Sequence, residues 1–132
     1  MLSENEKTLK SGIFITFSGN CREALIHYKA CFGGVLYFET FDKELKGYTK
    51  KPVIRGTLVS DSITIHGSDL VHDEGRKIGN YLSVFLPCKN VKQRNVLIAK
   101  LKPAVEGRDT MDEDQQLIEV KDAFDVRWIL GV

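Results

Sequence analysis

The sequence repeats one pattern, a short apolar run followed by a helical segment, and this repetition restricts the possible folds more than any other feature. Asn20 and Asn90 lie 70 positions apart, and each follows an apolar run and precedes apolar residues at helical spacing, over residues 21–32 and 91–101. Both asparagines are suitable helix N-caps, and Glu23 stands at the capping-box position of the first. The sequence therefore predicts the order β-α-β-β-β twice, although chance recurrence of a common arrangement stays open.

Short runs of apolar, β-branched and aromatic residues predict the strands. They cover residues 12–17, 35–41, 53–59 and 63–66 in the first half, and 81–86, 115–120 and 126–132 in the second half, where the second strand of the repeat is weak. We therefore expect an α+β fold, mostly antiparallel, with one helix of each module on the outside of the sheet. Module one spans about residues 12–68 and module two about 78–131, in a single domain with a polar tail at residues 1–11.

Composition excludes several classes of protein without naming an activity. The 132 residues fit one folded domain, and a net charge of +1 gives no general attraction to nucleic acid or to an anionic membrane. The lysines between residues 43 and 51 predict a solvated loop. Three cysteines, without a CxxC motif, predict reduced thiols and no disulfide framework. The polar N-terminus is no signal peptide, and no run reaches the roughly 20 apolar residues of a membrane span, so we expect a cytoplasmic protein.

The segment Phe17-Ser18-Gly19-Asn20-Cys21-Arg22-Glu23-Ala24-Leu25, with Tyr28-Lys29 and Phe32-Gly33-Gly34 after it, resembles the opening motif of the PhnB-like branch of the vicinal oxygen chelate superfamily. That superfamily also contains glyoxalases, extradiol dioxygenases and bleomycin resistance proteins. Residues 122–130 are similar to the closing strand of the branch, and Gly79-Asn80 to the entry of its fifth strand. The resemblance covers about residues 12–131 and implies two βαβββ modules that form a curved, partly open barrel around a cleft.

The superfamily usually holds a divalent metal in this cleft through His, Glu or Gln side chains from four strands. By the resemblance, these positions fall near Ile13, Ser83 and Ile129 and within Thr64–His66, where only His66 can ligate a metal. A shift of the alignment by one residue brings in no other ligand. We therefore expect no metal and no other cofactor.

A second candidate metal site is a polar cluster after the fourth predicted strand. It contains His66, Asp69, His72, Asp73 and Glu74. Its spacing matches neither a helix nor a tight turn, so a solvated loop is the favoured interpretation.

Strand alternation predicts which side chains line the cleft. Ile54, Ile65, Leu82, Val84 and Trp128 are expected to pack against the helices. The ligand-binding candidates on the opposite face are Arg55, Thr57, Thr64, His66, Tyr81, Ser83, Phe85 and Arg127. Two guanidinium groups and a titratable imidazole in one concave face favour a small anionic ligand.

These observations leave three functions open. The first is a PhnB-like, glyoxalase-related protein that binds a small molecule without the usual metal; no catalytic residue can be assigned. The second is a metal-dependent lyase or dioxygenase of glyoxalase type. The third is a subunit whose main role is protein association. We expect a homodimer, because an incompletely closed sheet leaves edges available for pairing, and we expect no nucleic acid or membrane partner.

Overall fold

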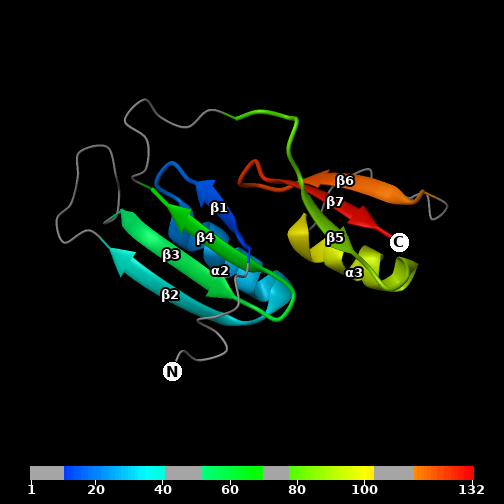
Figure 1. The fold of residues 1–132 in the computed structure, drawn as a ribbon, viewed down its shortest axis with the longest axis horizontal. Coiled ribbons are helices and arrows are strands. Elements are labelled where there is room, and N and C mark those ends of the chain that lie inside the picture. Colours follow the sequence, from blue (N-terminus) through cyan, green and yellow to red (C-terminus); the bar gives the residue numbers. More distant parts are fainter. Residues whose placement is uncertain (1–10, 41–51, 70–77, 103–114) are drawn as a thin grey trace, which may run out of the picture. The chain divides into compact units, whose positions relative to one another are not determined.

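The computed structural model describes residues 11–40, 52–69, 78–102 and 115–132, which fall into two compact units that meet in the chain at Gly75 and Arg76 (Figure 1). The first contains β1 (Ile13–Thr16), α2 (Cys21–Phe32), β2 (Val35–Thr40), β3 (Val53–Val59) and β4 (Thr64–Ser68). The second contains β5 (Val84–Pro87), α3 (Val91–Leu101), β6 (Leu117–Lys121) and β7 (Arg127–Gly131). The predicted α+β class is confirmed.

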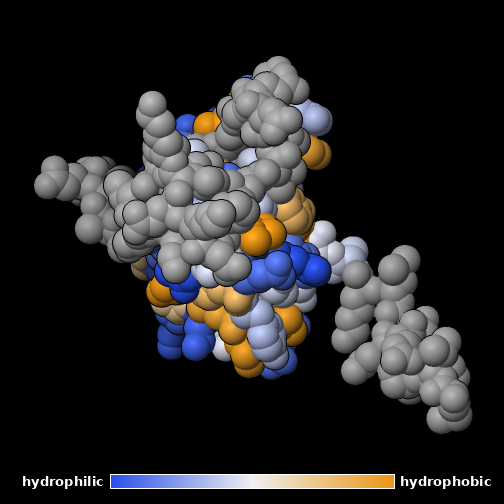
Figure 2. All heavy atoms as spheres, turned by 90° about the vertical axis from the view of Figure 1, so that its left-hand side faces the viewer, coloured by the Kyte–Doolittle hydropathy of each residue, from blue (hydrophilic) through white to orange (hydrophobic). Residues whose placement is uncertain are grey.

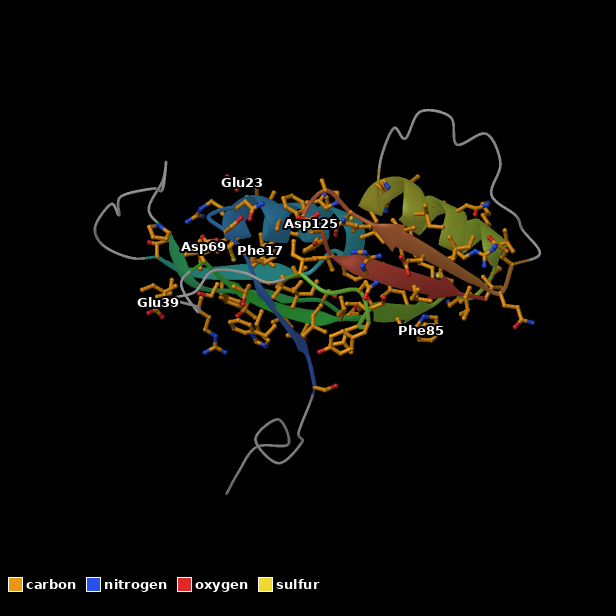
Figure 3. All side chains as sticks on the ribbon, turned by 90° about the horizontal axis from the view of Figure 1, so that it is seen from above. Phe17, Glu23, Glu39, Asp69, Phe85 and Asp125 are labelled. Atoms are coloured by element: carbon orange, nitrogen blue, oxygen red, sulfur yellow. The ribbon has the colours of Figure 1, made fainter. Side chains whose placement is uncertain are left out.

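The first unit is a four-stranded sheet with α2 against one face (Figures 1 and 3). Its strand order is β1-β4-β3-β2; β1 runs parallel to β4, and the other neighbours are antiparallel. Leu25 and Tyr28 of α2 pack in a core with Phe17, Leu58 and Ile65, all at most 2% exposed. This unit has the predicted order β-α-β-β-β.

The second unit repeats the parallel pair and its antiparallel neighbour. Its strand order is β5-β7-β6, with β5 parallel and β6 antiparallel to β7. Ile98 and Leu101 of α3 belong to a core with Val120, Trp128 and Leu130. The sequence between α3 and β6, where the order of the repeat puts its weak second strand, lies largely outside the described residues. Both sheets are mixed, and neither closes into a barrel.

The two helices begin in different ways. The Asn90 side chain accepts a hydrogen bond from the Gln93 N–H at 2.8 Å, which confirms the predicted cap of α3. Asn20 is the N-cap residue of α2 as predicted, but the side-chain hydrogen bond expected of a cap is absent. A carboxylate distant in the sequence replaces it: Asp69 Oδ1 accepts from Gly19 N at 2.9 Å and from Cys21 N at 3.1 Å. Asp69 is therefore a structural residue at the N-terminus of α2.

Two residues expected to pack against helices are exposed instead. Ile54 is 36% exposed, because the register shifts at this point: Glu39 pairs with Arg55, but Thr40 pairs with Val53. The bulge leaves Ile54 without a partner and turns Val53 inward. Leu82 is 72% exposed, because β5 begins only at Val84. The expectation holds for Ile65 and Trp128, which are fully buried.

The β6–β7 hairpin is organised by a buried carboxylate. Asp122 Oδ2 accepts a hydrogen bond from Trp128 Nε1 at 2.8 Å, and its Oδ1 accepts from the N–H groups of Phe124 and Val126.

Cys21, Cys31 and Cys88 are all free thiols. None of the helices in the described part of the chain has the length and hydropathy needed to cross a membrane.

Candidate functional site

The candidate site lies on the face of the first sheet opposite α2, here called the open face. Gly56 and Gly67 point toward α2: a Cβ at Gly56 would lie 2.6 Å from Leu25 Cδ1, and one at Gly67 would lie 2.7 Å from Phe17 Cε2. Because side chains alternate along a strand, Arg55 and Thr57 of β3 and Thr64 and His66 of β4 point the other way. The first sheet thus brings four of the eight predicted site residues to one face: Arg55, Thr57, Thr64 and His66.

One row of residues, here called the central row, crosses all four strands on the open face. Phe14 of β1 pairs with His66 of β4, His66 pairs with Thr57 of β3, and Thr57 pairs with Tyr37 of β2. Phe14 is 55% exposed and Tyr37 is 60% exposed. Two largely uncovered aromatic rings therefore stand on either side of an imidazole and a hydroxyl.

The imidazole of His66 is held by its neighbour in the central row. Its Nδ1 lies 3.1 Å from Thr57 Oγ1, within hydrogen-bond distance. None of the hydrogen bonds among the described residues uses Nε2. Gly12 stands beside the ring, and a Cβ there would lie 3.5 Å from His66 Cδ2, so the absence of a side chain leaves this edge of the ring uncovered. An imidazole oriented at Nδ1 can offer Nε2 as a donor, an acceptor or a proton-transfer group.

The rows on either side of the central row differ in chemistry. One is largely apolar, because Thr64 pairs with Val59 and Val59 pairs with Val35, and both valines are about half exposed. The other is charged, because Arg55 pairs with Glu39, whose side chain points away from α2 (Figure 3). Figure 2 shows hydrophobic and hydrophilic residues side by side at the surface that faces the viewer. Across the three rows, the side chains of the open face thus change from apolar to charged.

The second sheet has its own face opposite α3, where Phe85 and Arg127 lie. Phe85 is 56% exposed and points away from α3 (Figure 3). Arg127 Nη1 lies 2.7 Å from Glu119 Oε1, and this pair compensates the arginine charge. Tyr81 and Ser83 precede β5, so strand alternation does not orient them, and Tyr81 is 85% exposed. The participation of these four residues in a ligand site stays a prediction.

The open faces do not fit the metal site that the resemblance implies. Ile13 pairs with Ile65 on the α2 side, so Phe14 occupies the open face of the first strand. In the second sheet, Phe85 and Ile129 form the corresponding pair. Across these positions His66 alone has a metal-ligating side chain. No three His, Cys, Asp or Glu side chains come together among the described residues; His72, Asp73 and Glu74 lie outside them.

Sequence reasoning missed the aromatic flanks and the carboxylate partners. Phe14 and Tyr37 follow the same alternation as His66 and Thr57, so extending that argument to the first two strands identifies them. Glu39 and Glu119 have no comparable signal, because their pairing with arginines depends on the register between strands.

Comparisons with known proteins support the fold. No protein-family model and no curated protein matches the sequence. Among solved structures, the chain is similar to protein PA1353 from Pseudomonas aeruginosa, with a TM-score of 0.73 and 24% identity over 94% of this chain and 97% of that one. It is also similar to the PhnB protein from Bacillus cereus, with a TM-score of 0.69 and 18% identity over 93% of this chain and 98% of that one. At these identities the likeness shows a shared fold.

Proposed function

We propose that this chain is a PhnB-like protein that binds a small organic molecule on the open face of the first sheet, without a divalent metal. The observation that carries the proposal is the central row, in which Phe14 and Tyr37 stand exposed on either side of the hydrogen-bonded pair of His66 and Thr57. Aromatic walls with a few oriented polar groups are typical of small-molecule sites.

The polar groups restrict the chemistry of the ligand. His66 Nε2 serves as the directional hydrogen-bonding group, and Arg55, one row away, supplies positive charge. Arg55 faces Glu39 across the strands, so an anionic group on the ligand has to compete with that carboxylate. We therefore propose a ligand with a flat apolar body, which the aromatic rings contact, and one anionic or hydrogen-bond-accepting group near His66 and Arg55.

The dye anilinonaphthalene sulfonate has this combination of an aromatic body and an anionic group, and it tests the proposal. We expect saturable binding to the native protein, with Kd weakened about two- to twelvefold in Phe14→Ala or Tyr37→Ala, since an aromatic contact contributes roughly 0.5–1.5 kcal/mol. Ile26→Ala is the matched control, because Ile26 is 51% exposed on α2. If the aromatic variants bind the dye as the control does, the open face is not the site.

Once the dye site is mapped, metabolites that displace the dye identify the natural ligand class. His66→Ala and Thr57→Val should weaken displacement by ligands that hydrogen bond, and Arg55→Gln should weaken displacement by anionic ligands. Circular dichroism of each variant excludes dye binding to a partly unfolded state, which exposes apolar surface non-specifically. If none of these substitutions changes the displacement of the dye, the roles assigned to His66, Thr57 and Arg55 are wrong.

Protein association is a second candidate function for the same face. Val35 and Tyr37 of β2 and Val59 of β3 are neighbours on this face and are each at least 45% exposed, and exposed apolar groups in one patch also suit a protein partner. We propose a homodimer, supported by β2, which is an edge strand of the sheet that the described residues form. Light scattering of wild type and Tyr37→Ala separates the two functions. A change in mass in the variant supports association through this face.

A further inference from the structure

The second unit contains a fully buried cation, Arg94, in the first turn of α3. Arg94 is 0% exposed and lies on the buried stripe of the helix with Ile98 and Leu101. Its Nη1 donates a hydrogen bond to the carbonyl oxygen of Gln115 at 2.6 Å. Its Nε and Nη2 are also buried, and neither has a hydrogen-bond partner among the described residues. Two of the three guanidinium nitrogens are therefore unsatisfied.

The free-energy cost of burying Arg94 cannot be reduced by deprotonation of its side chain. Arginine stays protonated in proteins, and a buried ion without a partner costs several kcal/mol. A carbonyl oxygen such as that of Gln115 satisfies a hydrogen bond but does not neutralise the charge. The hydrogen bond to Gln115 therefore leaves the charge of Arg94 without a counter-ion within the described part of the chain.

The carboxylates among the described residues of this unit do not supply that anion. Residues 78–102 and 115–132 contain three acidic side chains, and each is engaged elsewhere. Glu119 pairs with Arg127, Asp122 binds the indole of Trp128, and Asp125 lies 3.5 Å from Lys121. The Cys88 thiol is not the counter-ion either. Burial raises the pKa of Cys88, and the opposing effect of Arg94 is smaller, so the thiol is neutral.

The geometry of the unsatisfied donors identifies the class of ligand. Nε–H and Nη2–H lie on the same edge of the planar guanidinium, and this pair forms parallel hydrogen bonds to two oxygens of one oxyanion. The Gln115 contact occupies Nη1 and leaves that edge unused. We propose that Arg94 binds a small oxyanion, such as phosphate, sulfate or a carboxylate, through its Nε/Nη2 edge. This site lies on the helix side of the second sheet and does not depend on the open face of the first.

Thermal stability in the presence of inorganic phosphate or sulfate tests the proposal. Sodium chloride holds the ionic strength constant, so that general screening does not contribute. An anion that binds only the native state raises Tm by about 3–5 °C at roughly ten times its Kd, and Tm continues to rise with the logarithm of the anion concentration. Arg94→Met should abolish the rise in Tm. Arg94→Lys should reduce it, because lysine keeps the positive charge but lacks the paired N–H donors of the guanidinium. Lys92→Met, which removes an exposed charge on the same helix, should respond as wild type does.

Arg94→Met also has an expected effect without added anion. Replacing an unpaired buried ion by an apolar side chain of similar length should leave Tm in chloride unchanged or raise it. A rise in Tm with phosphate that is equal in wild type and Arg94→Met would overturn the proposal, as would the absence of any rise in wild type. The sequence places Asp112, Glu113 and Asp114 directly before Gln115. If a variant with these three as amides responds to phosphate and wild type does not, the chain supplies its own carboxylate and the proposed external ligand is wrong.

Discussion

Asp69→Ala should destabilise the first unit strongly, because one carboxylate joins three parts of the chain. Asp69 is 6% exposed. Its Oδ1 accepts hydrogen bonds from Gly19 N and Cys21 N at the start of α2, and its Oδ2 accepts from Val53 N in β3 at 3.0 Å. The substitution removes all three acceptor contacts and leaves buried N–H groups without a replacement.

The magnitude follows from these contacts. The two bonds at the start of α2 act as the helix N-cap, which contributes up to about 2 kcal/mol. A buried N–H left without an acceptor, as at Val53, costs about 1–3 kcal/mol. The expected loss is therefore about 3–5 kcal/mol, or a fall in Tm of roughly 10–15 °C. Asp69→Asn keeps one acceptor oxygen of the same size and should lose about half as much.

Urea unfolding followed by circular dichroism measures this loss, with Asp61→Ala as the control. Asp61 lies exposed in the turn between β3 and β4, and its loss should change the free energy of unfolding by at most about 0.5 kcal/mol. If Asp69→Ala unfolds within 1 kcal/mol of that control, the capping argument is wrong. Trp128, the only tryptophan, reports the second unit by fluorescence. If its transition stays at the wild-type urea concentration while the first unit unfolds earlier, the single-domain prediction fails.

Other predictions follow from packing, burial and strand edges. Gly67→Ala should lower Tm by several degrees, because its Cβ would lie 2.7 Å from Phe17 Cε2; an unchanged Tm in scanning calorimetry would contradict this packing. Burial, and then the charge of Asp69, raises the pKa of Cys21 from 9.0 to about 12, so disulfide reagents near pH 8 should label Cys88 before Cys21. The stability that neutral Cys21 contributes is complete below about pH 9 and is lost as pH rises toward 12, so Cys21→Ala should flatten the alkaline decline in Tm. A homodimer has twice the chain mass of 14.9 kDa in light scattering, and a monomer at micromolar concentration would refute it.

The elements could be predicted because their signals are local. The residues of α2 and α3 repeat at helical spacing, and both helices end where the sequence indicates. The faces of Arg55, Thr57 and His66 also follow from alternation within one strand. These predictions need only the period of the local structure, which a sequence displays directly.

The errors and the contacts that sequence reasoning missed share a different cause, which is that they depend on residues distant in the chain. Asn20 has the chemistry of an N-cap, but Asp69, 48 residues after Cys21, reaches the same N–H groups. Ile54 belongs to an apolar run, but the bulge that exposes it is defined by pairing with β2. The partner of Arg127 is Glu119 on the neighbouring strand. In each case the decisive contact is set by register or tertiary packing, which one segment does not encode by itself.

The open faces of the two units have the same backbone arrangement but different chemistry. In the first unit the parallel pair and its antiparallel neighbour place Phe14, His66 and Thr57 in one row; the second unit places Phe85, Ile129 and Glu119 in the equivalent row. The aromatic position is kept, while the imidazole is replaced by an alkyl group. The open face of the first unit therefore carries an imidazole at the position where the open face of the second unit carries an alkyl side chain.

On the helix side of the sheets the second unit carries the polar side chain, and the first unit carries an apolar one. The 70-residue offset that relates Asn20 to Asn90 pairs the buried Ala24, Tyr28 and Cys31 of α2 with the buried Arg94, Ile98 and Leu101 of α3. Ala24 shows that this position of the fold accepts a small apolar side chain at no electrostatic cost. The packing of the repeat therefore does not require a cation at position 94. A charge that packing does not require, with one edge of its donors unused, is what an anion-binding role for Arg94 predicts.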